Sequence, residues 1–158
     1  RLGFASASLD AVTLWTVLEH VADPAQSLGE CARVLRRGGL LVVRTTAADS
    51  WGARLYGPCW LGYDAPRVLT VFSKHTLRRM LLDAGFGVAR IACYFSDYYP
   101  FLWSLRNLCQ AHIRAIPLRR LVLSSARSWP ARLLSLPFFA VQSVLGKNSY
   151  VTAVAFKL

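Results

Sequence analysis

The stretch that decides the fold runs from Leu9 to Thr46 and reads LDAVTLWTVLEHVADPAQSLGECARVLRRGGLLVVRTT. Its first residues, 9–15, are β-branched and aromatic, and they predict a short buried strand. Asp23-Pro24 predicts a helix start, because Asp caps free N–H groups and Pro fits the first helical position. We expect the helix to end at Gly38-Gly39 and a second strand to cover 40–46. A strand, a crossover helix and a strand form a right-handed βαβ unit, so we expect parallel strands covered on both faces.

Further elements follow along the chain. Ser73 predicts the cap of a helix that ends at Gly85. Segments 88–95 and 149–158 are strand candidates. Residues 100–148 predict a mostly helical region that is broken by three prolines, Pro117, Pro130 and Pro137. The expected fold is therefore a layered α/β architecture with about four strands.

Charge is distributed unevenly along the 158 residues, whose net charge is +11. Residues 1–97 carry 11 basic and 8 acidic side chains, whereas residues 98–158 carry 8 basic and none acidic. This asymmetry indicates a C-terminal part that meets anions, such as lipid headgroups or a phosphorylated substrate. Nucleic acid is not the expected partner, because the basic residues mix with bulky aliphatic ones and no nucleic-acid module is recognisable.

Four cysteines are present, with no CxxC motif and no Cys/His cluster that has zinc-site spacing, so no metal is expected. Reduced thiols favour a cytoplasmic location. The region 100–148 adds the expectation of membrane association, because arginines recur there among Leu, Ile, Phe and Trp. Its longest uncharged run, Leu133–Gly146, has 14 residues, fewer than the about 20 that span a bilayer. The alternative is a helical cap packed on the protein's own sheet.

A carboxylate and an imidazole, Glu19 and His20, follow the first predicted strand. Neighbouring residues project in different directions, so the two are not a metal pair on one helix face. We expect one to face a cleft and the other to order the loop. For His20 two interpretations stay open: a general base that takes a proton from a hydroxyl, or a loop-ordering hydrogen bond to the backbone.

The Leu9–Thr46 stretch resembles the second half of class I S-adenosylmethionine-dependent methyltransferases. The matching positions are Asp10, Leu18, Glu19, His20, Asp23, Pro24, Val34, Leu35, Gly38 and Gly39. Arg37 stands where the family often has Pro. The run WLGYDAPRVLTVFSKHTLRRMLLDAGF at 60–86 is similar to a downstream block of a bacterial subgroup, with Val68 in place of the usual His.

The resemblance implies a fold and a division of the chain. The fold would be the C-terminal part of a Rossmann-like sheet with its last strand antiparallel. Residues 1–99 would belong to the core, 100–148 would be a helical insertion or lid, and 149–158 would be the last core strand.

The resemblance also implies site residues. S-adenosylmethionine would be the cofactor, contacted by Trp15, Thr16 and Glu19, with core packing as the alternative for Trp15. Tyr63, Asp64 and Arg67 would contact the acceptor. For Arg67 the alternative is a surface pair with Asp64.

The family's Gly-rich turn after a strand, and its acidic ribose contact, have no counterpart in this sequence. We therefore expect the N-terminal half of the domain to be missing and the chain to be incompetent alone. The expected function of the complete protein is methyl transfer to a small or lipid-linked acceptor, chiefly to oxygen. Such catalysis rests mostly on positioning. The alternative is a non-catalytic membrane-peripheral or partner-docking module.

Overall fold

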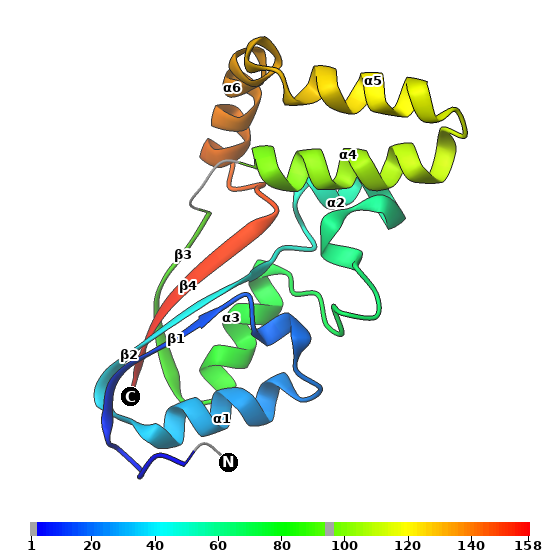
Figure 1. The fold of residues 1–158 in the computed structure, drawn as a ribbon. Helices are drawn as coiled ribbons and strands as arrows, with labels where there is room; N and C mark the ends of the chain where they lie inside the picture. The colour runs from blue at the N-terminus through cyan, green and yellow to red at the C-terminus, as the bar shows by residue number, and fades with distance from the viewer. Residues whose placement is uncertain (1–2, 94–96) are drawn as a thin grey trace.

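The computed structural model describes residues 3–93 and 97–158, which form a four-stranded sheet with a helical arm at one end (Figure 1). The elements are β1 (Leu9–Trp15), η1 (Leu18–His20), α1 (Pro24–Val34), β2 (Leu35–Thr46), α2 (Trp51–Tyr56), η2 (Gly57–Cys59), η3 (Leu61–Tyr63), α3 (Lys74–Asp83), β3 (Phe86–Ala92), α4 (Tyr98–His112), α5 (Ile116–Arg127), α6 (Trp129–Val144) and β4 (Tyr150–Lys157).

The strands of the sheet lie in the order β1-β2-β4-β3. β1 and β2 pair in parallel, with Trp15 opposite Arg44. β4 runs antiparallel to both of its neighbours, β2 and β3. The expected α/β fold, with four strands and an antiparallel last strand, is confirmed.

Two of the helices begin where the sequence predicts. The Asp23 carboxylate accepts a hydrogen bond from the Gln26 N–H at 2.9 Å at the start of α1. The Ser73 hydroxyl accepts from the Thr76 N–H at 3.0 Å at the start of α3. These side chains satisfy N–H groups that have no partner inside the helix. α1 and α3 then bury a set of fully covered side chains against the sheet: Leu28, Val34, Leu77 and Leu81.

The end of α1 differs from the prediction. The helix ends at Val34, and β2 begins at once because Leu35 pairs with Leu9 on β1. The next β1 pair joins Ala11 to Leu40, so β2 bulges between these two contacts. Gly38 lies in the bulge with a left-handed φ of 72°, a conformation that glycine adopts at little cost. The glycine pair therefore marks a β-bulge and not a helix end.

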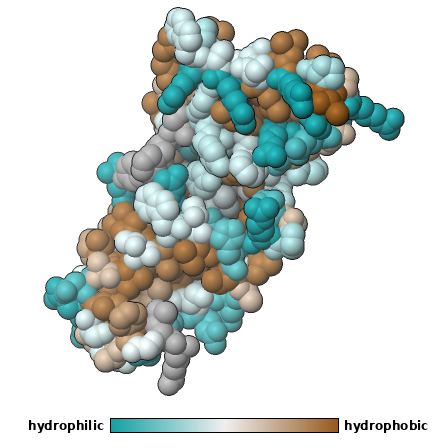
Figure 2. All heavy atoms as spheres, viewed as in Figure 1, coloured by the Kyte–Doolittle hydropathy of each residue, from teal (hydrophilic) through white to brown (hydrophobic). Residues whose placement is uncertain are grey.

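The expectation of a sheet covered on both faces is wrong for the described residues. β1 is an edge strand, and its side chains alternate so that Ala11, Thr13 and Trp15 are exposed on one face. Phe156 on β4 is also 43% exposed. Figure 2 shows hydrophobic residues gathered over this part of the molecule. Because α1 and α3 pack on the opposite face, the sheet has a helical layer on one side (Figure 1).

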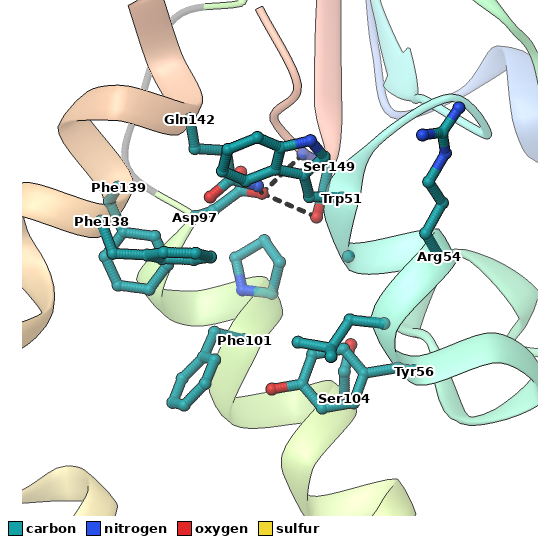
Figure 3. A pocket seen from close by; sticks show the side chains of 13 residues that line it. Trp51, Arg54, Tyr56, Asp97, Phe101, Ser104, Phe138, Phe139, Gln142 and Ser149 are labelled. Carbon is teal, nitrogen blue, oxygen red and sulfur yellow. Dashed lines mark hydrogen bonds between the residues drawn. The ribbon is translucent and has the colours of Figure 1, made fainter. Parts of the chain in front are cut away.

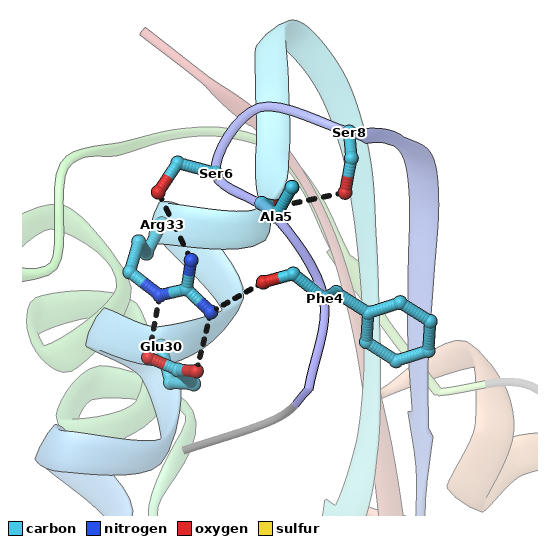
Figure 4. Close-up of polar contacts among 6 residues, drawn as sticks. All are labelled: Phe4, Ala5, Ser6, Ser8, Glu30 and Arg33. Carbon is cyan, nitrogen blue, oxygen red and sulfur yellow. Dashed lines mark hydrogen bonds and ion pairs between the residues drawn. The ribbon is translucent and has the colours of Figure 1, made fainter.

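Arg33 on α1 forms hydrogen bonds with the segment that precedes β1 (Figure 4). Its guanidinium donates to the Ser6 hydroxyl and to the Phe4 carbonyl, both at 2.9 Å. It also forms two hydrogen bonds with the Glu30 carboxylate, at 2.8 and 2.9 Å. The bidentate pair orients the guanidinium, so one side chain holds both the helix and the incoming chain.

The helical arm consists of α4, α5 and α6 and lies at the end of the sheet where β2 ends and β4 begins (Figure 1). Pro117 and Pro130 lie in the first turns of α5 and α6, so they start helices. Pro137 lies inside α6, which continues through it, contrary to the predicted break. Of the strand predicted at 88–95, Tyr94 and Phe95 lie outside the described residues. None of the described helices combines the length and the apolar character that a bilayer crossing requires.

Candidate functional site

The carboxyl end of β1 carries the first two residues of the candidate site. Trp15 ends the strand and is 52% exposed. Thr16 adopts a left-handed φ of 51°, a strained conformation for a β-branched residue. Its N–H donates to the Arg44 carbonyl at 2.9 Å, and its hydroxyl donates to the Trp15 carbonyl at 2.8 Å. This turn leads the chain out of the sheet and into η1, so both residues lie at the edge where open α/β sheets bind ligands.

Arg44 on β2 lies beside Trp15 at the carboxyl end of β1. The sequence motifs do not predict it as a site residue. Its guanidinium carbon lies 4.8 Å from the centre of the Trp15 ring and 4.5 Å from the centre of the Tyr150 ring. Burial lowers the pKa of Arg44 from its ordinary value, but arginine remains charged in proteins. The two rings therefore hold a cation by cation–π contact. The sequence signal is a charged residue inside an otherwise apolar strand.

Glu19 is buried, at 2% exposure. Its backbone carbonyl accepts from the N–H groups of Leu69 and Thr70, at 2.8 and 3.2 Å. Its side-chain oxygen Oε2 is buried and has no hydrogen-bond partner among the described residues. A buried carboxylate oxygen of this kind is costly, and the nearby Arg44 guanidinium interacts electrostatically with Glu19.

His20 lies beside the same loop and is exposed. Its Nδ1 is 2.6 Å from the Arg67 carbonyl oxygen. Because a carbonyl only accepts, Nδ1 carries the hydrogen in this contact, and the Nε2 of a neutral ring is left as an acceptor. The geometry thus provides the loop-ordering hydrogen bond and leaves Nε2 free to take a proton, so both interpretations of His20 remain compatible.

The loop between α2 and α3 holds the three predicted acceptor contacts. Tyr63 is 45% exposed, and its ring meets the buried Trp60 ring edge to face at 5.1 Å. Arg67 lies 3.6 Å from the Asp64 carboxylate, which is the surface pair that the sequence left open. The structure therefore brings Arg67 to His20 through its backbone, while Tyr63 packs against Trp60.

A cavity of about 380 Å³ lies where α2, α4 and α6 meet (Figure 3). Five aromatic side chains contribute to its wall: Trp51, Tyr56, Phe101, Phe138 and Phe139. Burial raises the pKa of Tyr56 to about 12, so the phenol stays neutral at physiological pH. Pockets of this volume bind small molecules in many proteins.

One end of the cavity is polar and centres on Asp97, which is 3% exposed. Its Oδ2 accepts from the Ser149 N–H at 2.7 Å, the Ser149 hydroxyl at 2.8 Å and the Gln142 side-chain N–H at 2.7 Å. Burial raises the pKa of the Asp97 carboxyl above its ordinary value, although these hydrogen bonds act in the opposite direction. The cluster joins the end of the loop after β3, α6 and the start of β4.

The cavity and the end of β1 are connected through neighbouring residues. Ser149 in the polar cluster precedes Tyr150, whose ring contacts Arg44, and Arg44 in turn lies over Trp15. The apolar cavity and the exposed Trp15 ring therefore belong to the same end of the sheet. No group of His, Cys, Asp and Glu side chains suited to a metal ion occurs within residues 3–93 and 97–158.

Comparison with known proteins identifies the domain. Residues 3–91 match a family described as the methyltransferase domain. The chain belongs to this family. The match covers β1, the carboxyl-end turn, η1 and the loop that His20 contacts, so the methyltransferase domain includes the candidate residues from Trp15 to Arg67.

Two curated relatives are similar to parts of this chain. A protein of Mycobacterium tuberculosis, named a probable S-adenosylmethionine-dependent methyltransferase, is 36% identical over 93 residues, which are 54% of this chain and 30% of that protein. An uncharacterised 37.1 kDa protein of a Streptomyces fradiae transposon is 30% identical over 148 residues, or 84% of this chain and 41% of that protein. The chain spans less than half the length of these relatives.

Solved structures show the same fold. A methyltransferase from Thermotoga maritima matches with a TM-score of 0.58 at 17% identity, over 100% of this chain and 60% of that one. A geranyl diphosphate C-methyltransferase from Streptomyces coelicolor, in complex with S-adenosyl-L-homocysteine, matches with a TM-score of 0.55 at 17% identity, over 100% of this chain and 51% of that one.

Proposed function

We propose that the protein containing this chain transfers a methyl group from S-adenosylmethionine to an oxygen atom of a small or lipid-linked acceptor. The observation that carries the proposal is the family match over residues 3–91. Its support in the structure is the exposed Trp15 and the strained turn at Thr16, which lie at the carboxyl end of β1.

The residues present fit one wall of a cofactor site. The exposed Trp15 ring offers a flat apolar surface, and the Glu19 Oε2 offers a buried acceptor without a hydrogen-bond partner among the described residues. The sequence contains no Gly-rich turn between a strand and a following helix, so we propose that residues outside 1–158 supply the other wall. When bound, S-adenosylmethionine supplies an electrophilic methyl group on its sulfonium.

The roles of this chain's residues are then positioning and proton removal. His20 Nε2 would take the proton of the acceptor hydroxyl, because Nδ1 is held by the Arg67 carbonyl. Tyr63, Asp64 and Arg67 would orient the acceptor from the loop between α2 and α3. Holding the oxygen in line with the transferred group is the largest contribution expected, since it replaces a bimolecular encounter.

Cofactor binding tests the proposal. We expect the full-length protein to bind S-adenosylmethionine in isothermal titration calorimetry, and Trp15→Ala to weaken the affinity about tenfold because the flat ring surface is lost. Trp129→Ala is the matched control, since Trp129 is an exposed tryptophan on α6 and should leave the affinity unchanged. A wild-type protein that binds no S-adenosylmethionine would contradict the proposal.

A second candidate function is docking to an anionic membrane, as part of the enzyme or as a non-catalytic module. α5 has no buried residue, and α5 and α6 expose large apolar side chains: Ile116, Leu121, Trp129, Leu133, Leu134, Val141 and Val144. Arginines alternate with them, and residues 98–158 contain no acidic side chain. Figure 2 shows hydrophilic and hydrophobic residues interleaved over the arm. This mixture is typical of surfaces that lie in a membrane interface.

Vesicle sedimentation tests the membrane surface. We expect the full-length protein to sediment with vesicles of phosphatidylserine and phosphatidylcholine, and much less with phosphatidylcholine alone. Leu134→Glu should abolish sedimentation, because Leu134 is 83% exposed on α6 and the new carboxylate opposes burial in the interface. Leu82→Glu, on an exposed leucine of α3, is the control. Equal sedimentation of both variants would exclude this arm as the docking surface.

A further inference from the structure

The cavity between α2, α4 and α6 has five aromatic side chains in its wall and one polar end (Figure 3). Trp51 on α2 and Phe138 on α6 both line it and contact each other, with ring centres 5.7 Å apart. Phe139, next to Phe138, is 4% exposed and meets the Phe101 ring of α4 at 5.9 Å. Rings from three helices therefore form a rigid wall that suits a flat or branched hydrocarbon.

The polar end contains an acceptor that lacks a partner. The Gln142 side-chain N–H group donates to Asp97 Oδ2 at 2.7 Å and to the Lys147 carbonyl at 3.0 Å. Both of these partners only accept, so the amide orientation is determined and its oxygen must be Oε1. Gln142 is 2% exposed, and Oε1 has no hydrogen-bond partner among the described residues. Because Gln142 lines the cavity, a hydrogen-bond donor on a ligand would satisfy this oxygen.

The charged and polar side chains of the cavity wall indicate which class of ligand it can bind. Asp97 Oδ2 already accepts three hydrogen bonds, so it is not a free partner for an ammonium group. The charged side chains of the wall are Asp97 and Arg54, and Arg54 is exposed. A neutral molecule with a large apolar body and a hydroxyl at its buried end matches both the rings and the unpartnered Gln142 oxygen.

We propose that this cavity binds the acceptor's apolar body, and that the acceptor is a neutral, ring-containing or branched molecule with a hydroxyl, separate from the oxygen that is methylated, that donates to Gln142 Oε1. The proposal rests on the proposed function, since it names the class of acceptor for that reaction. The contacts from Ser149 through Tyr150 and Arg44 to Trp15 place the cavity at the same end of the sheet as the candidate cofactor wall. Phe138, which is 47% exposed, forms the side of the cavity that reaches the surface.

Titration with two matched probes tests the proposal. The probes are 2-naphthol and 2-fluoronaphthalene, which have nearly the same shape but differ in the ability to donate a hydrogen bond. We expect the full-length protein without cofactor to bind 2-naphthol at least about tenfold more tightly, because only the hydroxyl satisfies Gln142 Oε1. Equal affinities for the two probes would overturn the hydroxyl contact.

Variants localise the binding. Phe138→Ala should weaken 2-naphthol binding about tenfold by removing part of the aromatic wall. Phe156→Ala is the matched control, because Phe156 has a similar exposure, 43%, but lies on β4 away from the cavity wall. Equal losses in the two variants, or no binding by the wild type, would overturn the proposal.

A third variant examines the anchor itself. Gln142→Leu should abolish the preference for 2-naphthol over 2-fluoronaphthalene. This substitution also removes the hydrogen bonds to Asp97 and Lys147. If the variant does not fold, the result for Phe138→Ala tests the proposal instead. Titration of the same wild-type preparation with S-adenosylmethionine separates the two hypotheses. Binding of 2-naphthol without binding of S-adenosylmethionine would support the cavity and overturn its role in methyl transfer.

Discussion

Replacement of Asp97 by alanine is expected to lower the free energy of unfolding by about 3 kcal/mol, because buried donors that lose their partner retain their desolvation cost. The Asp97 Oδ2 accepts from the Ser149 N–H, the Ser149 hydroxyl and Gln142, and it joins segments 45 and 52 residues apart in the chain. Urea denaturation measures the change. Asp83→Ala, which removes an exposed carboxylate on α3, should cost little and serves as the control.

The Asp97 carboxyl group should also make the free energy of unfolding depend on pH. Burial raises the pKa of Asp97 above its ordinary value of 3.8, so the folded protein binds more protons than the unfolded chain between these two values. The part of the stability that depends on the protonation of Asp97 is therefore fully present below the ordinary pKa and is lost as pH rises through the raised pKa.

An asparagine at position 97 cannot titrate and keeps an acceptor oxygen. The wild type should thus lose stability relative to Asp97→Asn as pH rises from the ordinary value of 3.8 through the raised pKa of Asp97. Denaturation of both proteins across this range provides the measurement. A wild type that gains stability over the variant as pH rises would contradict the assigned direction of the pKa.

The sequence predicts those parts of the fold that depend on interactions between residues close together in the chain. Asp23-Pro24 and Ser73 start helices because the Asp23 and Ser73 side chains satisfy N–H groups three residues away. The alternation of apolar segments with these caps predicts the βαβ unit. The end of α1 is different, because the pairing of Leu35 with Leu9 decides where β2 begins. A glycine pair offers the same local signal for a helix end and for a bulge.

The candidate site also divides into residues that a local motif predicts and residues that no local motif predicts. Trp15, Thr16, Glu19 and His20 belong to one motif, and the structure keeps them together at the end of β1. The cavity could not be predicted, because Asp97, Gln142 and Ser149 meet only after α4, α5 and α6 have folded back along the chain. Such contacts leave no periodic pattern in the sequence. The one available signal is a single acidic residue, Asp97, before a long segment without any.

Replacement of His20 by asparagine is expected to lower kcat at least about 100-fold, which is the lower range for loss of a general base. This expectation rests on the proposed methyl transfer, measured from S-adenosylmethionine to 2,6-dihydroxynaphthalene, which offers a second hydroxyl, with the full-length protein. The asparagine amide can still donate to the Arg67 carbonyl, which His20 Nδ1 contacts at 2.6 Å. The loop should therefore keep its order, and the free energy of unfolding should change by less than about 0.5 kcal/mol.

The comparison with alanine distinguishes the two roles of this histidine. His20→Ala removes both the base and the hydrogen bond to Arg67, so it should lose activity to the same extent and also destabilise the loop by about 1 kcal/mol. His75→Asn, on an exposed histidine in the first turn of α3, should leave kcat unchanged. If His20→Asn keeps wild-type kcat while His20→Ala loses it, the imidazole acts only by holding the loop. The proton must then leave the acceptor by another route.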